Sequence, residues 1–105
     1  MADGVIHRGD VVWASMDPVV GHERSGHRPY LVLSEERFHR SRGLLLVVPM
    51  TSRRRDLPTW VELGPESFAI AEQPKTMSAK RVTRVDRAGH DVREVARLVA
   101  YLVGA

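Results

Sequence analysis

Two short apolar runs place the strongest constraint on what this chain can fold into. Residues 30–33 and 44–50 are each about the length of one strand, and neither contains a charged residue. Such runs predict buried strands of a sheet, with the second run near its centre. A polar group able to bind a phosphate stands at one end of each run, because Arg28 precedes the first and Thr51 follows the second. A rigid strand holds such side chains in fixed directions.

The rest of the chain is expected to be mostly strand, followed by one helix. Alternation and apolar clusters predict further strands over residues 7–16, 59–63, 68–72 and 79–85. Residues 35–43 predict either a polar connection or a short helix. Glycine and proline predict a turn at Asp17 and Pro18, an irregular loop over residues 19–28 and a bend at residues 74–78.

A change of period near the end of the sequence predicts a helix. Apolar residues recur at helical spacing at Val92, Val95, Val99 and Leu102, and Asp91 is a candidate N-cap with Glu94 three residues later. This amphipathic helix is expected to pack on the sheet. Strands first and a helix last predict an α+β fold, a small β-barrel with a C-terminal helix, in a single domain over residues 1–105.

Composition excludes several classes of protein. A chain of 105 residues suits one domain with a modest core. The absence of cysteine excludes a disulfide framework and a thiolate metal site, and it is compatible with a reducing cytoplasm. No apolar run approaches the roughly 20 residues that cross a bilayer, and the start lacks the features of a signal peptide. We therefore expect a cytoplasmic protein that does not enter a membrane.

Positive charge is concentrated in two stretches. The net charge is +3 and the sequence pI is near 9.9. One stretch contains Arg37, His39, Arg40 and Arg42, and the other is the run of Arg53, Arg54 and Arg55 that follows Thr51. Such clusters predict a polyanionic partner, because neutralising phosphates releases counterions. The alternative is solvated loops, but the position of the second run beside Thr51 favours a functional role.

Four ordered blocks carry a resemblance to a known family. They are Arg8-Gly9-Asp10-Val11-Val12-Trp13, Glu23-Arg24-Ser25-Gly26-His27-Arg28-Pro29, Pro49-Met50-Thr51, and Glu72-Gln73-Pro74-Lys75-Thr76. Each block alone is a weak signal, but their order and spacing span nearly the whole chain. On these residues the chain resembles the MazF/PemK family of toxin endoribonucleases.

The resemblance implies a fold, a reaction and two catalytic residues. The family has an SH3-like barrel with appended helices. It cleaves single-stranded RNA at short sequences, without a metal or other cofactor, through attack of the ribose 2′-hydroxyl to give a cyclic phosphate. Arg28 matches the family's catalytic arginine and Thr51 matches its phosphate-contacting threonine. A guanidinium can stabilise a phosphorane, but proton transfer by Arg28 stays open, since a free arginine has a pKa above about 12.

The resemblance also implies residues that bind the RNA. They are Glu23 and Arg24 in the first loop, Ser52, Arg53 and Arg54 after the catalytic threonine, and Gln73, Lys75 and Thr76 in the last block. Gln73 can read a base edge, and Lys75 can hold a phosphate. The chain departs from the family's pattern at Arg24, Pro74 and Ser78, which bears on sequence preference rather than on chemistry. Without the resemblance, a surface ion pair with Glu23 would be the ordinary role of Arg28.

Two histidines suggest other kinds of site. His22 and His27 are five residues apart, whereas the zinc-binding pair of a His-Glu-x-x-His motif is four apart on a helix, so we expect no metal site. A histidine acid–base pair of the pancreatic ribonuclease kind is chemically reasonable near pH 7. However, His27 and Arg28 are neighbours, and on an extended backbone their side chains point to opposite faces.

Two other classes of function stay open from the sequence. A CcdB-like toxin would bind DNA gyrase through a helix tip and would not need Arg28 and Thr51. A non-catalytic RNA- or DNA-binding SH3-like barrel would need only the positive charge. Besides single-stranded RNA, the resemblance implies two protein partners. They are a second copy in a homodimer and a cognate antitoxin whose acidic, partly disordered tail occupies the RNA groove.

Overall fold

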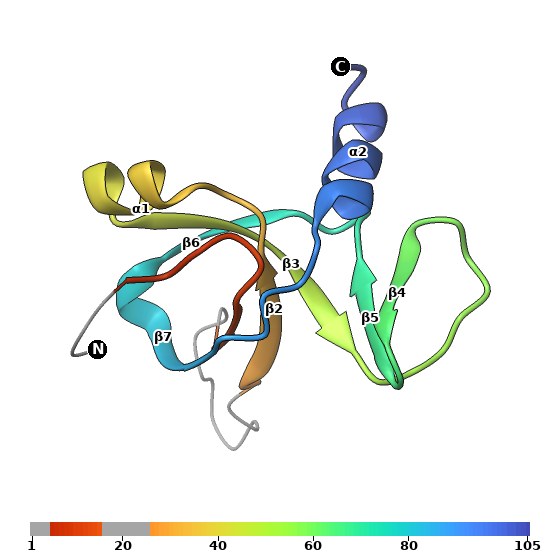
Figure 1. The fold of residues 1–105 in the computed structure, drawn as a ribbon, viewed down its shortest axis with the longest axis horizontal. Helices are drawn as coiled ribbons and strands as arrows, with labels where there is room; N and C mark the ends of the chain where they lie inside the picture. The colour runs from red at the N-terminus through yellow and green to blue at the C-terminus, as the bar shows by residue number, and fades with distance from the viewer. Residues whose placement is uncertain (1–4, 16–25) are drawn as a thin grey trace.

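Seven strands and two helices make up the part of the chain that the computed structural model describes, residues 5–15 and 26–105 (Figure 1). The strands are β1 (Val11–Ala14), β2 (Arg28–Val32), β3 (Leu44–Thr51), β4 (Trp60–Gly64), β5 (Ser67–Ile70), β6 (Lys75–Ser78) and β7 (Val82–Asp86). The helices are α1 (Glu36–Arg42) and α2 (Arg93–Leu102), and a 3-10 turn, η1 (Ala79–Arg81), leads into β7.

Strand β3 is the centre of the sheet. The strand order is β4-β5-β3-β2-β1-β7, and every pairing is antiparallel. One edge of β3 pairs with β2, while the other pairs first with β6 and then, at its end, with β5. Among the described strands no pairing joins β4 to β7, so the sheet curls without closing. The predicted α+β class is confirmed, and the barrel is open between these two strands.

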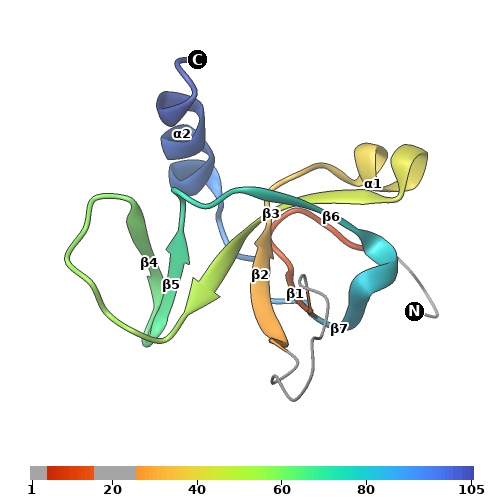
Figure 2. The same ribbon diagram turned by 180° about the vertical axis from the view of Figure 1, so that it is seen from behind.

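The central strands are buried on both faces, which explains why their sequences do not alternate. Across β1, β2 and β3, one face carries Val12, Tyr30 and Val47 into a core within the curl of the sheet. The opposite face carries Val11, Leu31 and Val48 into a second core, which α2 covers. Figure 2 shows the two sides, with the β4–β5 hairpin and α2 on one and the curl of β1, β2 and β7 on the other.

Helix α2 packs on the sheet mainly through its first turns. Val95 is fully buried there, and Val92, just before the helix, is also in the core. The prediction that Asp91 is the N-cap is wrong by one position, because Val92 is the N-cap residue and makes no side-chain cap. Leu102, predicted on the packed face, is 48% exposed because the helix continues past the edge of the sheet (Figure 1).

Asp91 nevertheless contributes to the start of α2. Its carboxylate accepts hydrogen bonds from the side chain and the backbone N–H of Arg93, and these lower the pKa of Asp91 to about 2. A carboxylate with a lowered pKa stabilises the fold above its unfolded pKa, and this contribution disappears as the pH falls through about 2.

Three other boundaries differ from the sequence predictions. The predicted bend at residues 74–78 is wrong, because Lys75–Ser78 is strand β6, paired with the first half of β3. The first half of β3 has one edge that β5 does not pair with. Strand β6 pairs with this edge and so satisfies the backbone hydrogen-bonding groups along it. The strand expected over residues 79–85 begins with a 3-10 turn, and of the strand expected over residues 7–16 the described residues, 7–15, form regular strand only in β1. The predicted turn at Asp17 and Pro18 lies outside the described residues.

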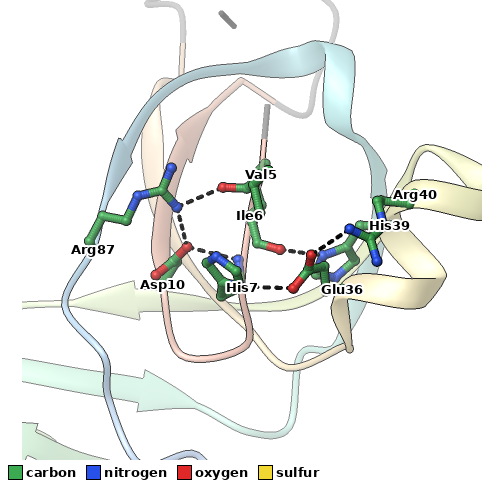
Figure 3. A network of polar contacts seen from close by, with 8 residues as sticks. All are labelled: Val5, Ile6, His7, Asp10, Glu36, His39, Arg40 and Arg87. Atoms are coloured by element: carbon green, nitrogen blue, oxygen red, sulfur yellow. Dashed lines mark hydrogen bonds and ion pairs between the residues drawn. The ribbon is translucent and has the colours of Figure 1, made fainter. Parts of the chain in front are cut away.

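The short-helix interpretation of residues 35–43 is confirmed as α1, and this helix supplies a buried histidine (Figure 3). Nδ1 of His39 lies 2.7 Å from the carbonyl oxygen of Ile6, and Nε2 lies 2.6 Å from the Ser34 hydroxyl. Because a carbonyl only accepts, Nδ1 donates to Ile6, and Nε2 shares the second hydrogen bond with the Ser34 hydroxyl. The Ser34 oxygen accepts from the N–H of Leu46 at 2.8 Å. The imidazole therefore ties the N-terminal segment to β2 and β3.

A buried carboxylate holds the other end of the N-terminal segment (Figure 3). Asp10 accepts from the backbone N–H of His7 and from the guanidinium of Arg87, each at 2.8 Å. Gly9 has a φ of +94°, and a Cβ there would lie 2.6 Å from the carbonyl oxygen of His90. Gly9 and Asp10 are therefore both needed to join the segment before β1 to the segment after β7.

We expect His39→Leu to lower the free energy of unfolding by about 2–4 kcal/mol, because leucine leaves the Ile6 carbonyl and the Ser34 hydroxyl without their partner. Urea titration followed by circular dichroism measures the change. The matched control is Arg40→Ala, which removes only an exposed ion pair with Glu36 on the same helix and should change the value by less than about 1 kcal/mol. A small loss of the same size in both variants would contradict the role assigned to the imidazole.

Candidate active-site groove

The pairing of β2 with β3 puts Arg28 and Thr51 on one face of the sheet. In this register Val32 faces Val47 and Tyr30 faces Pro49, and the pairs end there, two residues short of Arg28 at the start of β2 and of Thr51 at the end of β3. Because side chains alternate along a strand, Arg28 and Thr51 lie on the same face of the sheet as Tyr30 and Val47. The two predicted catalytic residues therefore lie on one face, at the rim of one core.

A groove of about 690 Å³ opens at this rim. We call it the basic groove, and it is lined by Arg28, Tyr30, Pro49, Met50, Thr51, Ser52, Arg53, Trp60, Ile70, Gln73 and Lys75. These residues come from β2, β3, β4, β5, the loop after β3 and the segment that leads into β6.

The basic groove has one sign of charge. Arg28, Arg53 and Lys75 are all exposed, and no carboxylate is present among the described residues that line the groove. Cationic side chains arranged around a cleft attract and hold a polyanion. Arg28 and Arg53 carry guanidinium groups, which can contact two oxygens of one phosphate, whereas the Lys75 ammonium acts as a point charge.

The Thr51 hydroxyl takes part in a local turn at the end of β3. Its oxygen accepts a hydrogen bond from the backbone N–H of Arg53 at 3.1 Å. A hydroxyl that accepts in this way still has its own proton to donate, so it can approach a phosphate oxygen as a donor. The same bond fixes the direction in which the chain leaves β3 and places Arg53 at the groove.

Four of the eight residues predicted to bind RNA line the basic groove. Ser52, Arg53, Gln73 and Lys75 line it together with Arg28 and Thr51. Glu23 and Arg24, also predicted to bind RNA, lie outside the described residues.

Thr76 lies away from the basic groove. It follows Lys75 in strand β6, so the two side chains point to opposite faces, and Thr76 lines a separate pocket with Arg8, Ser34 and Phe38. The resemblance implies that both residues bind RNA, and in the described structure they line different pockets.

Arg54 is also outside the groove lining. Its guanidinium pairs with Glu62 at 3.3 Å and lies 5.1 Å from the centre of the Phe68 ring. The next residue, Arg55, lies 5.6 Å from the centre of the Trp60 ring. The basic loop after β3 therefore divides, with Arg53 at the groove and the next two arginines folded onto the β4–β5 hairpin.

The described residues do not support a histidine acid–base pair or a histidine metal site. Nε2 of His27 lies 2.7 Å from the hydroxyl of Thr83, and His27 is not among the residues that line the groove. His22 lies outside the described residues. Within residues 5–15 and 26–105, no three His, Cys, Asp or Glu side chains are placed to hold a metal ion.

The sequence did not identify Tyr30, Trp60 and Ile70 as parts of the site. Trp60 and Ile70 face each other across β4 and β5, and they form an apolar wall of the groove. Period-two alternation predicted a half-exposed strand at Trp60, but nothing in the sequence says which surface its exposed face adjoins.

A second pocket, of about 470 Å³, meets the basic groove at the end of β3. Trp13 is one of its walls, with the indole N–H donating to Asp86 at 3.1 Å and the Arg84 guanidinium 4.6 Å from the ring centre. Met50, Thr51 and Ser52 line both pockets.

No helix in the described part of the chain is long and apolar enough to cross a membrane.

Known proteins similar to this chain fall in one family. A family model described as "PemK-like, MazF-like toxin of type II toxin-antitoxin system" matches residues 7–103. The endoribonuclease toxin MazF of Escherichia coli strain K12 is 36% identical over 73 residues, which are 67% of this chain and 66%, just under two thirds, of that protein. The endoribonuclease EndoA of Bacillus subtilis strain 168 is 33% identical over 88 residues, covering 75% of this chain and 76% of that protein.

The fold leads to the same family. A crystal structure of MazE-MazF from Deinococcus radiodurans matches with a TM-score of 0.79 and 29% identity, over 95% of this chain and 96% of that chain. The family model covers residues from His7, in the segment tied down by Asp10, to Val103 at the end of α2. On this match the chain belongs to the PemK-like, MazF-like toxins of type II toxin-antitoxin systems.

Proposed function

We propose that this chain is an endoribonuclease toxin that cleaves single-stranded RNA in the basic groove, without a metal ion. The observation that carries the proposal is that Arg28 and Thr51 line the same groove, together with the cations Arg53 and Lys75. Relatives named as endoribonucleases support the same activity.

In the proposed reaction the RNA supplies its own nucleophile. The 2′-oxygen forms a bond to phosphorus, the bond from phosphorus to the 5′-oxygen breaks, and a cyclic phosphate and a 5′-hydroxyl result. One proton leaves the 2′-hydroxyl and one reaches the 5′-oxygen. Negative charge grows on the two other phosphate oxygens, and a positioned guanidinium stabilises this charge more in the transition state than in the bound substrate. We assign this role to Arg28.

Thr51 and the remaining groove residues position the strand. The Thr51 hydroxyl donates to a phosphate oxygen and so fixes the scissile group relative to Arg28. Lys75 and Arg53 hold the neighbouring phosphates, and the Gln73 amide reads a base edge. In this proposal the chemistry takes place where β2 begins and β3 ends, and the other walls of the groove bind the strand.

We propose two protein partners and a cytoplasmic location. An antitoxin with an acidic tail suits a groove that has three cations and no carboxylate among its described lining residues. A MazE-MazF structure among the relatives of the fold supports an antitoxin partner. A homodimer suits the exposed apolar end of α2, where Tyr101 and Val103 are 74% and 72% exposed.

The first test removes the proposed catalytic side chains. Arg28→Ala is expected to lower the rate of RNA cleavage on the order of a hundredfold or more, the effect of deleting one donor to a transition state. Thr51→Ala should also be severely impaired. Both variants should keep the wild-type melting temperature, since both residues lie at strand ends outside the cores. Cleavage rates are measured on a labelled single-stranded RNA.

Two controls make this test specific. Arg40→Ala removes an exposed arginine of α1 and should cleave at the wild-type rate. His27→Ala should also stay active, because His27 does not line the groove. An active Arg28→Ala together with an inactive His27→Ala would overturn the assignment and favour the histidine alternative.

We expect cleavage to persist in excess EDTA, because the proposed chemistry uses the 2′-hydroxyl as nucleophile and Arg28 as the cation at the phosphate. The assay compares initial rates before and after dialysis against the chelator. Loss of activity with EDTA and recovery on adding Mg²⁺ or Mn²⁺ would refute the metal-independent mechanism.

Arg53→Glu is expected to weaken RNA binding and to flatten its salt dependence, because each lost phosphate contact lowers the slope by about 0.7 for a single strand. The same change should weaken binding of an acidic antitoxin tail, if the tail and RNA share the groove. Arg37→Glu, on α1, alters the net charge equally and is the matched control. Equal salt slopes in the two variants would mean that Arg53 is only solvated surface.

A further inference from the structure

We propose that Trp60 is a stacking platform for one nucleobase and that Arg55 covers this platform when no nucleic acid is bound. This inference rests on the proposed function, because it needs a single strand in the basic groove. It concerns two side chains outside the matched catalytic pair, and it arises from the arrangement of the β4–β5 hairpin.

The register of the sheet puts Trp60 on the same face as the catalytic pair. Thr51 faces Phe68 across β3 and β5, and Trp60 faces Ile70 across β4 and β5. Phe68 and Ile70 are two residues apart in one strand, so they share a face. Trp60 is half-buried and lines the basic groove with Arg28 and Thr51. An aromatic ring is therefore part of the wall of a cationic groove.

The indole N–H of Trp60 is the second observation. Nε1 is buried, and it has no hydrogen-bond partner within residues 5–15 and 26–105. Buried tryptophan N–H groups usually find an acceptor, and a donor that lacks one makes the surrounding arrangement less favourable. A rearrangement of the side chains that cover the ring would allow this donor to meet an acceptor on a base or a phosphate.

The guanidinium of Arg55 lies over the ring on which we propose that a base stacks. It lies 5.6 Å from the centre of the Trp60 ring, and this is its one charged or polar contact within the described ranges. Arg54 has two contacts, an ion pair with Glu62 and the ring of Phe68. Of the two neighbouring arginines, Arg55 is thus the one held by a single contact.

The relative strengths of the two contacts favour exchange. An exposed guanidinium over an aromatic ring contributes a factor of about two to five to an equilibrium. Stacking of a base on an aromatic side chain contributes a factor of roughly five to one hundred or more in affinity. A base can therefore displace Arg55, and the released guanidinium can then contact a phosphate of the same strand.

The test separates base contacts from phosphate contacts. The probes are a decamer of deoxyuridylate and an abasic decamer with the same backbone, neither of which has the 2′-hydroxyl that the proposed reaction needs. The quantity compared is the ratio of the two affinities in each variant. Trp60→Leu should lower this ratio about tenfold, because only the base-bearing strand uses the ring. Trp60→Phe, which keeps an aromatic ring, should restore most of it.

Two further variants fix the interpretation. Lys75→Ala should weaken both decamers equally and leave the ratio unchanged, since Lys75 is assigned to a phosphate. Arg55→Ala should raise the ratio about two- to fivefold, because the group that competes with the base is gone. Melting temperatures establish that each variant is folded, and the rise in the ratio expected of Arg55→Ala carries the test if Trp60→Leu does not fold.

An unchanged ratio of the two decamer affinities in folded Trp60→Leu would overturn the proposal that Trp60 is a stacking platform. A loss of binding to an acidic peptide without any change in the ratio would also overturn it, and would assign the ring to a protein partner. Because the decamers cannot be cut by the proposed reaction, the result is independent of the cleavage assay. A chain that does not cleave RNA but shows the Trp60 effect would refute the proposed function alone.

Discussion

Burial of both faces of β1, β2 and β3 is the constraint on which the rest of the structure depends. One face packs inside the curl of the sheet and the other packs under α2, so neither face can turn toward solvent without exposing core residues. A slip of one residue between β2 and β3 would exchange every side chain between the two faces. The resulting register puts Arg28 and Thr51 on one face of the sheet, where both line the groove, and the candidate site is thus positioned by apolar contacts several residues away.

The walls of the groove differ in how firmly they are held. Arg28 and Thr51 end strands whose interiors are buried, while Arg53 belongs to an exposed loop whose first turn is fixed by the Thr51 hydroxyl. The arginines that follow lie on aromatic rings of the hairpin. A rigid pair for chemistry thus adjoins side chains that can exchange contacts, which is a reasonable arrangement for a site that must accept a long polymer.

The sequence predicted the central strand better than it predicted the edges of the sheet. The apolar run after Gly43 became β3 over the expected residues, because burial on both faces leaves a strong local signal. The segment Lys75–Ser78 was expected to bend, because Pro74 is a local signal for a turn, whereas its pairing depends on the unpaired edge of β3 far away in sequence. The contact of Arg55 with Trp60 has no signature in spacing or composition.

The groove is assembled from segments that are distant in the sequence. Its three cations come from β2, the loop after β3 and β6, and each reaches the groove only when β3 is paired on both edges. A fragment that ends before residue 75 therefore lacks both Lys75 and the strand that completes the edge of β3. Synthesis must be nearly complete before any such site exists, and one proteolytic cut between these strands would separate its parts. Under the proposed function, a chain that stops before residue 75 would lack part of the groove that holds the RNA.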